Sequence, residues 1–178
     1  MTFATIGELE DFTDAKFTVS RAELALQLAS GAVESAAKTT HATIVKTDRE
    51  DLLDGTGTSV LTLPSWPVSD VTAVEIDGEA VTDFTWSRNG VLERDDKNWP
   101  QGRRNIKVSA TYGFADEDVP TEIKAVTLQA AARAILNPAR LNSFSDGQVS
   151  VGFGGGGVGT QVLDLLPGER DMVVRAVR

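Results

Sequence analysis

The residue types that most often carry catalysis are scarce in this chain of 178 residues. It has a single histidine, His41, and no cysteine. A thiol nucleophile, a disulfide and a multi-histidine metal site are therefore excluded, and any Ser–His–Asp arrangement would have to use His41. The chain has no Gly-x-Ser-x-Gly motif, and His41 comes just after an expected helix. We expect it to be a surface histidine.

A second possible site is the acidic run from Asp48 to Asp54, which contains four carboxylates. Clustered carboxylates can bind a hard cation, because such cations take oxygen ligands. The run lacks the spacing of an EF-hand loop, and Arg49 lies inside it. We therefore expect a solvated loop here and no metal.

The glycines Gly152, Gly154 and Gly157 match the letters of the dinucleotide-binding fingerprint. That fingerprint needs a helix to begin at once, so that the helix N-terminus meets the pyrophosphate. Here more glycine follows, and the lysine of a phosphate loop is missing, since Val158-Gly159-Thr160 stands in its place. The sequence also singles out no pair of acids for glycoside hydrolysis, although letters alone do not exclude one. We expect no enzyme activity and no cofactor.

The composition describes a chain that can bury a core, with 41% hydrophobic and 24% charged residues. The net charge of −9 argues against general nucleic-acid binding, which needs a cationic surface. No apolar run approaches the ~20 residues of a membrane-spanning helix, and the N-terminus lacks the pattern of a signal peptide. We expect a soluble protein made in the cytoplasm.

The stretch from about residue 43 to 112 has the pattern of a small antiparallel β unit, with short apolar runs that end in turn residues. Thr43–Lys46 is a candidate strand. Asp77-Gly78 predicts a two-residue hairpin turn, and Arg88-Asn89-Gly90 predicts a second hairpin. We expect the aromatic residues of this unit to serve core and edge packing rather than a ligand platform; these are Trp66, Trp86, Trp99 and Tyr112.

Helical patterns flank the β unit. Ser20 to Glu23 fits a capping box and predicts a helix from about Arg21 to Lys38. A second helix is predicted from Pro120 to the Asn137-Pro138 stop. Each helix has one main apolar stripe and further apolar residues on another face, namely Leu24, Leu28, Leu128 and Ile135. A helix that is apolar on two faces has two neighbours; the second is either an adjacent subunit or another part of the same domain.

The sequence predicts an arm at each end of the chain. Residues 1–19 predict a docked N-terminal arm, with Ile6, Leu9 and Phe12 loosely spaced for a short helix. Near the other end a strand pattern, with Val149, Val151 and Phe153 alternating, is followed by four glycines. With the glycines as a flexible hinge, this segment could add a strand to the sheet edge of a partner protein. The alternative is that the segment is a disordered surface loop. Pro167 begins a last helix, in which Met172, Arg175 and Arg178 are candidates for docking.

Together these patterns predict an α+β fold, with long antiparallel helices flanking a small antiparallel β unit at about 43–112 and an extended flexible C-terminal arm with a terminal helix. We divide the chain into an N-terminal arm (1–19), a core of helix, β unit and helix (20–141), and a glycine-rich arm with a docking helix (142–178).

The chain from about Ser20 to Arg178 contains a series of short motifs whose order is characteristic. They are Leu53–Thr58, Leu61–Pro64, Trp66-Pro67-Val68, Val74–Gly78, Phe84-Thr85-Trp86, Gly90-Val91-Leu92, Trp99-Pro100, Val108–Phe114, Val119–Lys124, Ala131-Ala132-Arg133, Val149-Ser150-Val151 and Pro167–Arg170. In this order the chain resembles the head-to-tail connector (adaptor) family of long-tailed bacteriophages. The glycine run Gly154–Gly157 is longer than that family suggests.

The resemblance implies a subunit of a dodecameric ring in the virion neck, bound beneath the portal protein and followed by a stopper or tail-completion protein. DNA passes through the lumen of such a ring without sequence-specific binding. The resemblance implies no activity and no cofactor, and it assigns the C-terminal candidates Val149, Val151, Phe153, Met172, Arg175 and Arg178 to portal docking. A net charge of −9 suits a channel that must not grip DNA.

Two other interpretations remain open. One is a monomeric, β-rich carbohydrate- or receptor-binding module, for which exposed aromatic side chains would form the ligand surface. The other is a different component of the neck, a stopper or tail-completion subunit.

Overall fold

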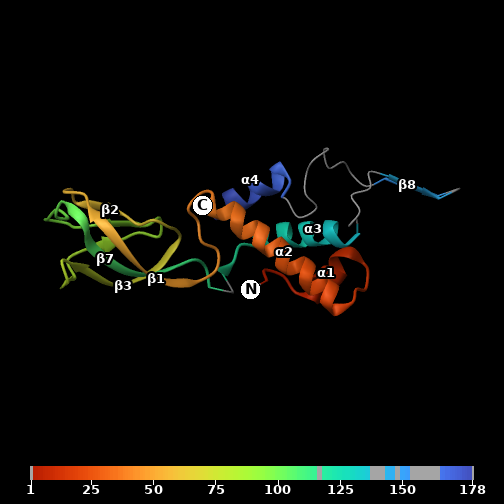
Figure 1. The fold of residues 1–178 in the computed structure, drawn as a ribbon, viewed down its shortest axis with the longest axis horizontal. Helices are drawn as coiled ribbons and strands as arrows, with labels where there is room; N and C mark the ends of the chain where they lie inside the picture. Colours follow the sequence, from red (N-terminus) through yellow and green to blue (C-terminus); the bar gives the residue numbers. More distant parts are fainter. Residues whose placement is uncertain (1, 116–117, 137–142, 147–148, 153–164, 178) are drawn as a thin grey trace. The chain divides into compact units, whose positions relative to one another are not determined.

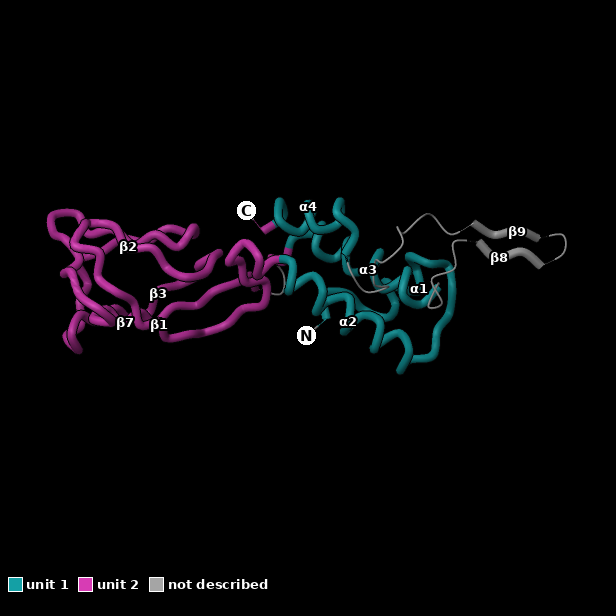
Figure 2. The backbone as a smooth tube through the Cα atoms, turned by 45° about the horizontal axis from the view of Figure 1, so that its top comes forward, with its two compact units in different colours: residues 1–36, 120–176 teal, residues 37–119, 177–178 magenta. Residues whose placement is uncertain are grey.

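A computed structural model describes residues 2–115, 118–136, 143–146, 149–152 and 165–177, with the backbone alone for the segments between 143 and 152. The chain divides into two compact units, shown in Figure 2. Unit 1 comprises Met1–Ala36 and Pro120–Ala176, and unit 2 comprises Ala37–Val119 and Val177–Arg178. Helices dominate unit 1 and antiparallel strands dominate unit 2 (Figure 1), so the α+β class is confirmed. The predicted division at residues 19 and 141 stays a prediction.

Unit 1 begins with helix α1 (Ile6–Thr13), which has a capping box at Thr5 and Glu8 that was not predicted. The Thr5 hydroxyl accepts the backbone N–H of Glu8, while the Glu8 carboxylate accepts the N–H of Thr5 at 2.8 Å. Leu9 is fully buried, and the backbone N–H of Phe3 donates to the hydroxyl of Ser30 at 3.1 Å. The N-terminal segment is therefore a docked helix.

Helix α2 (Val19–Lys38) begins before the predicted cap. The backbone N–H groups of Arg21 and Ala22 both donate to the carbonyl of Thr18. Ser20 thus already lies within the helix, and its assignment as the N-cap was wrong. The predicted apolar stripe is confirmed, because its six residues are all buried: Ala22, Ala25, Leu26, Ala29, Val33 and Ala36.

Helix α3 (Thr121–Leu136) packs against both α1 and α4 (Pro167–Ala176). Its described part ends at Leu136, and the predicted Asn137-Pro138 stop lies outside the described residues. Two neighbours are consistent with the burial of half of its positions, including residues from both predicted stripes. The guanidinium of Arg21 on α2 donates to the carbonyl of Ile135 on α3 at 2.9 Å.

Unit 2 contains two antiparallel sheets. The larger has the order β1 (Thr47–Gly55), β7 (Gly102–Tyr112), β3 (Val68–Ile76) and β4 (Glu79–Val81). The smaller has the order β2 (Val60–Thr62), β6 (Val91–Glu93) and β5 (Thr85–Trp86). The predicted antiparallel β unit is therefore confirmed.

The acidic run at Asp48–Asp54 is part of strand β1, so the prediction of a loop there was wrong. The predicted strand Thr43–Lys46 was also wrong, because only Val45 and the neighbouring Ala42 form isolated bridges. β1 pairs along β7 from Thr47↔Tyr112 to Leu53↔Ile106. That pairing overrides the low strand propensity of aspartate and glutamate.

The turn chemistry was predicted correctly. Asp77 and Gly78 have φ values of 51° and 87°, the left-handed pair that a two-residue hairpin of this type requires between β3 and β4. Gly90, with φ of 77°, closes the second hairpin between β5 and β6. Both glycines have a positive φ, a backbone conformation that residues with a Cβ atom rarely adopt.

The two sheets share one core, formed by the inward-facing residues Leu61, Leu63, Val68, Val74, Leu92, Trp99, Ile106, Val108, Ala110 and Tyr112. Trp99 and Tyr112 are almost completely buried, which confirms the packing role predicted for them. Trp86 differs, because 38% of its surface stays exposed.

The C-terminal part of unit 1 holds a short hairpin of β8 (Ser143–Asp146) and β9 (Val149–Gly152), paired from Ser143↔Gly152 to Asp146↔Val149. β9 confirms the strand predicted from Val149 and Val151, whereas β8 was not predicted. α4 begins at Pro167, as predicted. Among the described residues, no helix is long and apolar enough to cross a bilayer.

Candidate assembly surfaces

The single histidine of the chain, His41, is exposed, as predicted. His41 lies in a turn with φ of 61°, and its carbonyl accepts the Ser65 hydroxyl at 2.8 Å and the backbone N–H of Trp66 at 3.2 Å. The part of the chain that the structure describes contains no group of three or more histidine or acidic side chains that could hold a metal ion.

The acids of β1 are engaged with the neighbouring strand. Asp48 accepts the Thr111 hydroxyl at 2.6 Å, and Asp51 accepts the Tyr112 hydroxyl at 2.7 Å. Arg49 pairs with Asp51 at 2.8 Å and lies 4.6 Å from the centre of the Tyr112 ring. Burial, together with the hydrogen bond to Asp51, raises the pKa of the Tyr112 hydroxyl well above its ordinary value. The acidic run thus joins β1 to β7.

The four residues predicted to contact a second subunit separate into two pairs. Leu128 and Ile135 of α3 are 9% and 4% exposed, so they are covered by the chain itself. Leu24 and Leu28 of α2 are 56% and 43% exposed. Whether these residues contact another subunit stays a prediction, but only Leu24 and Leu28 are accessible to one in the chain as described.

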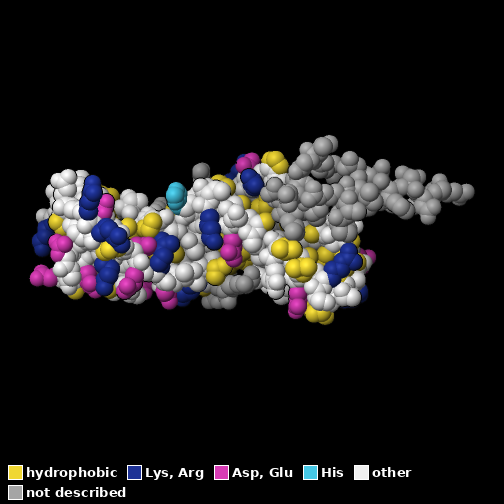
Figure 3. Space-filling model, in the orientation of Figure 1, with side chains coloured by type: hydrophobic (Ala, Val, Ile, Leu, Met, Phe, Trp, Pro, Cys, Tyr) yellow, Lys and Arg dark blue, Asp and Glu magenta, His cyan; other side chains and the backbone are white. Residues whose placement is uncertain are grey.

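Leu24 and Leu28 belong to an uncharged stripe on the outer side of α2, which continues with Gly31 and Ser35 at helical spacing and is exposed throughout. The stripe lies opposite the buried face of the helix. Figure 3 shows hydrophobic side chains gathered over α2. An apolar helix stripe without charge, left in solvent, is typical of an interaction surface.

Helix α4 is held against α3 by Arg133 and Glu169, whose side chains make two hydrogen bonds of 2.6 Å and 3.0 Å. Val173 is fully buried on the same side. The docking candidates Met172 and Arg175 are exposed. Of the other candidates, Val149 and Val151 are described only by the backbone of β9, and Phe153 and Arg178 lie outside the described residues.

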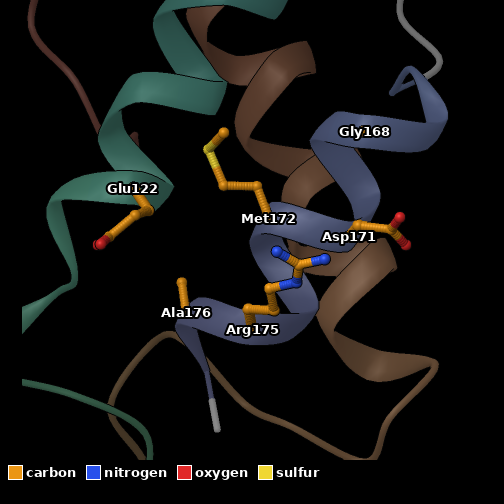
Figure 4. Close-up of a pocket in the computed structure, with 6 residues that line it drawn as sticks. All are labelled: Glu122, Gly168, Asp171, Met172, Arg175 and Ala176. Atoms are coloured by element: carbon orange, nitrogen blue, oxygen red, sulfur yellow. The ribbon is translucent and has the colours of Figure 1, made fainter.

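A shallow pocket of about 440 Å³ lies beside α4 and the start of α3. Figure 4 shows the Met172 side chain between the two helices, with Glu122 on α3 and Arg175 and Asp171 on α4. Its lining carries charged groups of both signs, the carboxylates of Glu122 and Asp171 and the guanidinium of Arg175.

Charges of both signs are interspersed over the face of unit 2 in Figure 3, without a broad cationic patch. The chain as a whole has 17 basic and 26 acidic residues. This distribution does not favour strong binding to a nucleic-acid backbone, which needs clustered lysine and arginine side chains.

No protein-family model and no curated protein matches the sequence. Solved structures do share the fold. A chain of the neck of a native gene transfer agent (GTA) particle, computed with C12 symmetry, matches with a TM-score of 0.55 and 16% identity over 80% of this chain and 81% of that chain. A chain of the neck of the empty particle, computed with C6 symmetry, matches with a TM-score of 0.57 and 18% identity over 85% and 84%.

A chain of the virion of the native gene transfer agent particle matches with a TM-score of 0.59 and 15% identity, over 98% of this chain and 89% of that chain. Nearly the whole chain is therefore covered, including the parts on either side of the β unit. This protein has the fold of chains found in the neck and virion of a gene transfer agent particle.

Proposed function

We propose that the chain is a structural protein of a virion neck: a head-to-tail adaptor that forms a homo-oligomeric ring beneath the portal protein and surrounds the channel through which DNA leaves the head. The observation that carries this proposal is the fold, shared over 80% or more of the chain with chains of particle necks that were computed with C12 and C6 symmetry. Such symmetry arranges equivalent copies of a chain around one axis, where neighbouring copies can contact each other.

The exposed stripe of α2 supports contact between copies. Leu24 and Leu28 expose apolar surface, and Gly31 and Ser35 let a neighbouring backbone approach closely. Burying two leucine side chains against a neighbour contributes roughly 1.5–3 kcal/mol for each full burial. In a ring of 12 copies this contribution would be repeated at every interface.

The C-terminal helix supports contact with a different protein. α4 exposes Met172 and Arg175 beside the pocket next to α3. A polarisable apolar side chain next to a cation suits a partner surface with an apolar patch and a carboxylate. We assign this surface to the portal protein, and a stopper or tail-completion protein to the other end of the ring. We assign the chain no enzyme activity and no cofactor.

The first experiment measures assembly. The purified chain, alone and with the portal protein of its own particle, is analysed by size-exclusion chromatography with light scattering and by electron microscopy. The variant Leu24→Glu/Leu28→Glu is expected to lose the ring and keep its unfolding free energy within about 0.5 kcal/mol, since both side chains are exposed in the single chain. Gln27→Glu, an exposed position on the same helix, is the matched control and is expected to assemble normally.

The second experiment determines the position. Cryo-electron microscopy of the particle, with the chain carrying a labelled terminus, is expected to show the label in a ring directly beneath the portal. A label one layer further down would make the chain a stopper or tail-completion subunit. A neck without the chain, or a chain that stays monomeric in every mixture, contradicts the proposal and favours the monomeric binding module.

A further inference from the structure

Unit 2 contains a second pocket, of about 480 Å³, whose floor is apolar. Pro67 and Phe114 are buried beneath it, and the exposed ring of Trp86 forms part of its wall. The guanidinium of Arg88 lies 5.2 Å from the centre of the Phe114 ring. The volume is large enough to take one aromatic side chain of a partner.

Two cations line this pocket, Lys46 and Arg88, and both are exposed. Neither makes an ion pair within the described part of the chain, where seven other lysine and arginine side chains do. Asp118 is the one carboxylate among the described residues that line it. In a protein of net charge −9, two unpaired cations around an aromatic floor favour an aromatic side chain flanked by carboxylates.

Unit 1 carries a surface of that description on α1. The side chain of Phe12 is 53% exposed. Asp11 and Asp14 on either side of it are also exposed and make no direct ion pair in the described structure, whereas Glu8 and Glu10 are paired with Lys124 and Lys16. Among the exposed large hydrophobic side chains of the described residues, the aromatic ones are Phe12 and Trp86.

We propose that Phe12 of one copy inserts into the Lys46–Arg88 pocket of the next copy, where Asp11 and Asp14 meet the two cations. The inference rests on the proposed ring and names a contact that links its subunits. Because Phe12 and the pocket are different parts of the chain, each copy contributes its Phe12 to one contact and its pocket to another. A head-to-tail contact of this kind closes into a ring when the rotation between copies allows it.

The first test uses the absence of cysteine from the chain. The double variant Phe12→Cys/Trp86→Cys is oxidised across a series of protein concentrations and run on a non-reducing gel. The expected result is a ladder of linked copies, while a mixture of the two single variants gives dimers and nothing larger. Phe12→Cys/Val60→Cys, with a cysteine at another exposed position of unit 2, is the control and is expected to give no ladder.

The second test keeps both aromatic residues and reverses charges. Arg88→Glu and Asp14→Lys are each expected to weaken association about tenfold or more, and the combination is expected to restore most of it. Arg103→Glu and Glu23→Lys reverse exposed charges elsewhere on the same two units and are expected to leave association unchanged. Thermal unfolding of each variant shows that the fold is retained.

The outcomes separate this contact from the ring itself. If rings form in the light-scattering measurement but no ladder appears and the charge reversals have no effect, the Phe12 contact is overturned. The ring proposal then still stands. A link within one copy, seen as a monomer that migrates faster, also overturns it. A chain that stays monomeric throughout overturns both.

Discussion

Arg133 on α3 and Glu169 on α4 face each other as a two-pronged ion pair, with distances of 2.6 Å and 3.0 Å. Glu169 is almost completely buried, and its carboxylate also accepts the backbone N–H of Leu166 at 2.7 Å. A buried carboxylate without its cation costs several kcal/mol. The position of the C-terminal helix on α3 therefore depends on this pair.

Glu169→Gln is expected to lower the free energy of unfolding by roughly 2–3 kcal/mol, somewhat below the loss for a completely buried pair, because the Arg133 side chain is 28% exposed. Urea unfolding followed by circular dichroism measures the loss, and limited proteolysis shows whether α4 has detached. Asp171→Asn, on the exposed side of the same helix, is the control. Equal stability of the two variants would mean that α4 is held by its apolar face alone.

Tyr112 is the single tyrosine of the chain, so its ionisation can be followed directly by ultraviolet absorption. Burial and the hydrogen bond to Asp51 raise the pKa of its hydroxyl above the ordinary value of 10.0. The folded state therefore holds this proton more tightly than the unfolded state does. Its contribution to stability is complete below about pH 10 and is lost as the pH rises above that value. We expect no tyrosinate signal until the protein unfolds.

Tyr112→Phe removes the donor and leaves the Asp51 carboxylate paired with Arg49. We expect a loss of about 1.5–3 kcal/mol at neutral pH, the range for hydrogen bonds to charged groups. The variant should also show a weaker decrease in stability above pH 10. A tyrosinate signal in the wild-type protein at its ordinary pKa, with the near-ultraviolet dichroism still intact, would disprove the buried hydrogen bond.

Two glycines are expected to respond to alanine in opposite directions. At Gly113, φ is 91° and an added Cβ would lie 2.5 Å from the carbonyl oxygen of Val45, so Gly113→Ala is expected to destabilise the protein by more than about 1 kcal/mol. At Gly31, inside α2, an added Cβ meets nothing within 4 Å, and Gly31→Ala is expected to stabilise it by about 0.5–1 kcal/mol. Chemical denaturation of the monomer measures both, and two changes of the same sign would contradict the geometry.

The ion pair between Glu8 and Lys124 joins α1 to α3 at 2.7 Å on the protein surface. The hydrogen bond from Lys124 lowers the pKa of Glu8 to about 2. The contribution of this ion pair to the stability of the folded state is therefore present above the ordinary pKa of 4.5, and it is lost as the pH falls from there towards 2.

Because both side chains of this pair are partly exposed, Lys124→Ala is expected to cost less than about 1 kcal/mol at neutral pH and low salt. High salt should reduce that cost further. Thermal unfolding at pH 7 and pH 3, in low and high salt, measures both effects, and Lys38→Ala serves as the control at an exposed lysine without this partner. A cost that is the same at both pH values would remove the role assigned to Glu8.

Much of the local structure was predictable because it depends on neighbouring residues. Asp77-Gly78 predicted its hairpin since few other pairs tolerate two left-handed residues in succession. The buried stripe of α2 followed from the spacing of its alanines, and Pro167 marked the start of α4. These features need no knowledge of what packs against them.

The sequence could not show what each segment packs against. The acidic β1 is a strand because it pairs with β7 along most of its length, although the paired residues lie about 50 positions or more apart along the chain. Leu128 and Leu24 are the same residue type on two helices of unit 1, yet Leu128 is almost completely buried while Leu24 stays exposed. Propensity and periodicity determined which elements form, and tertiary packing decided which of their faces remain free for other subunits, because burial is a property of the neighbours that a residue meets in space.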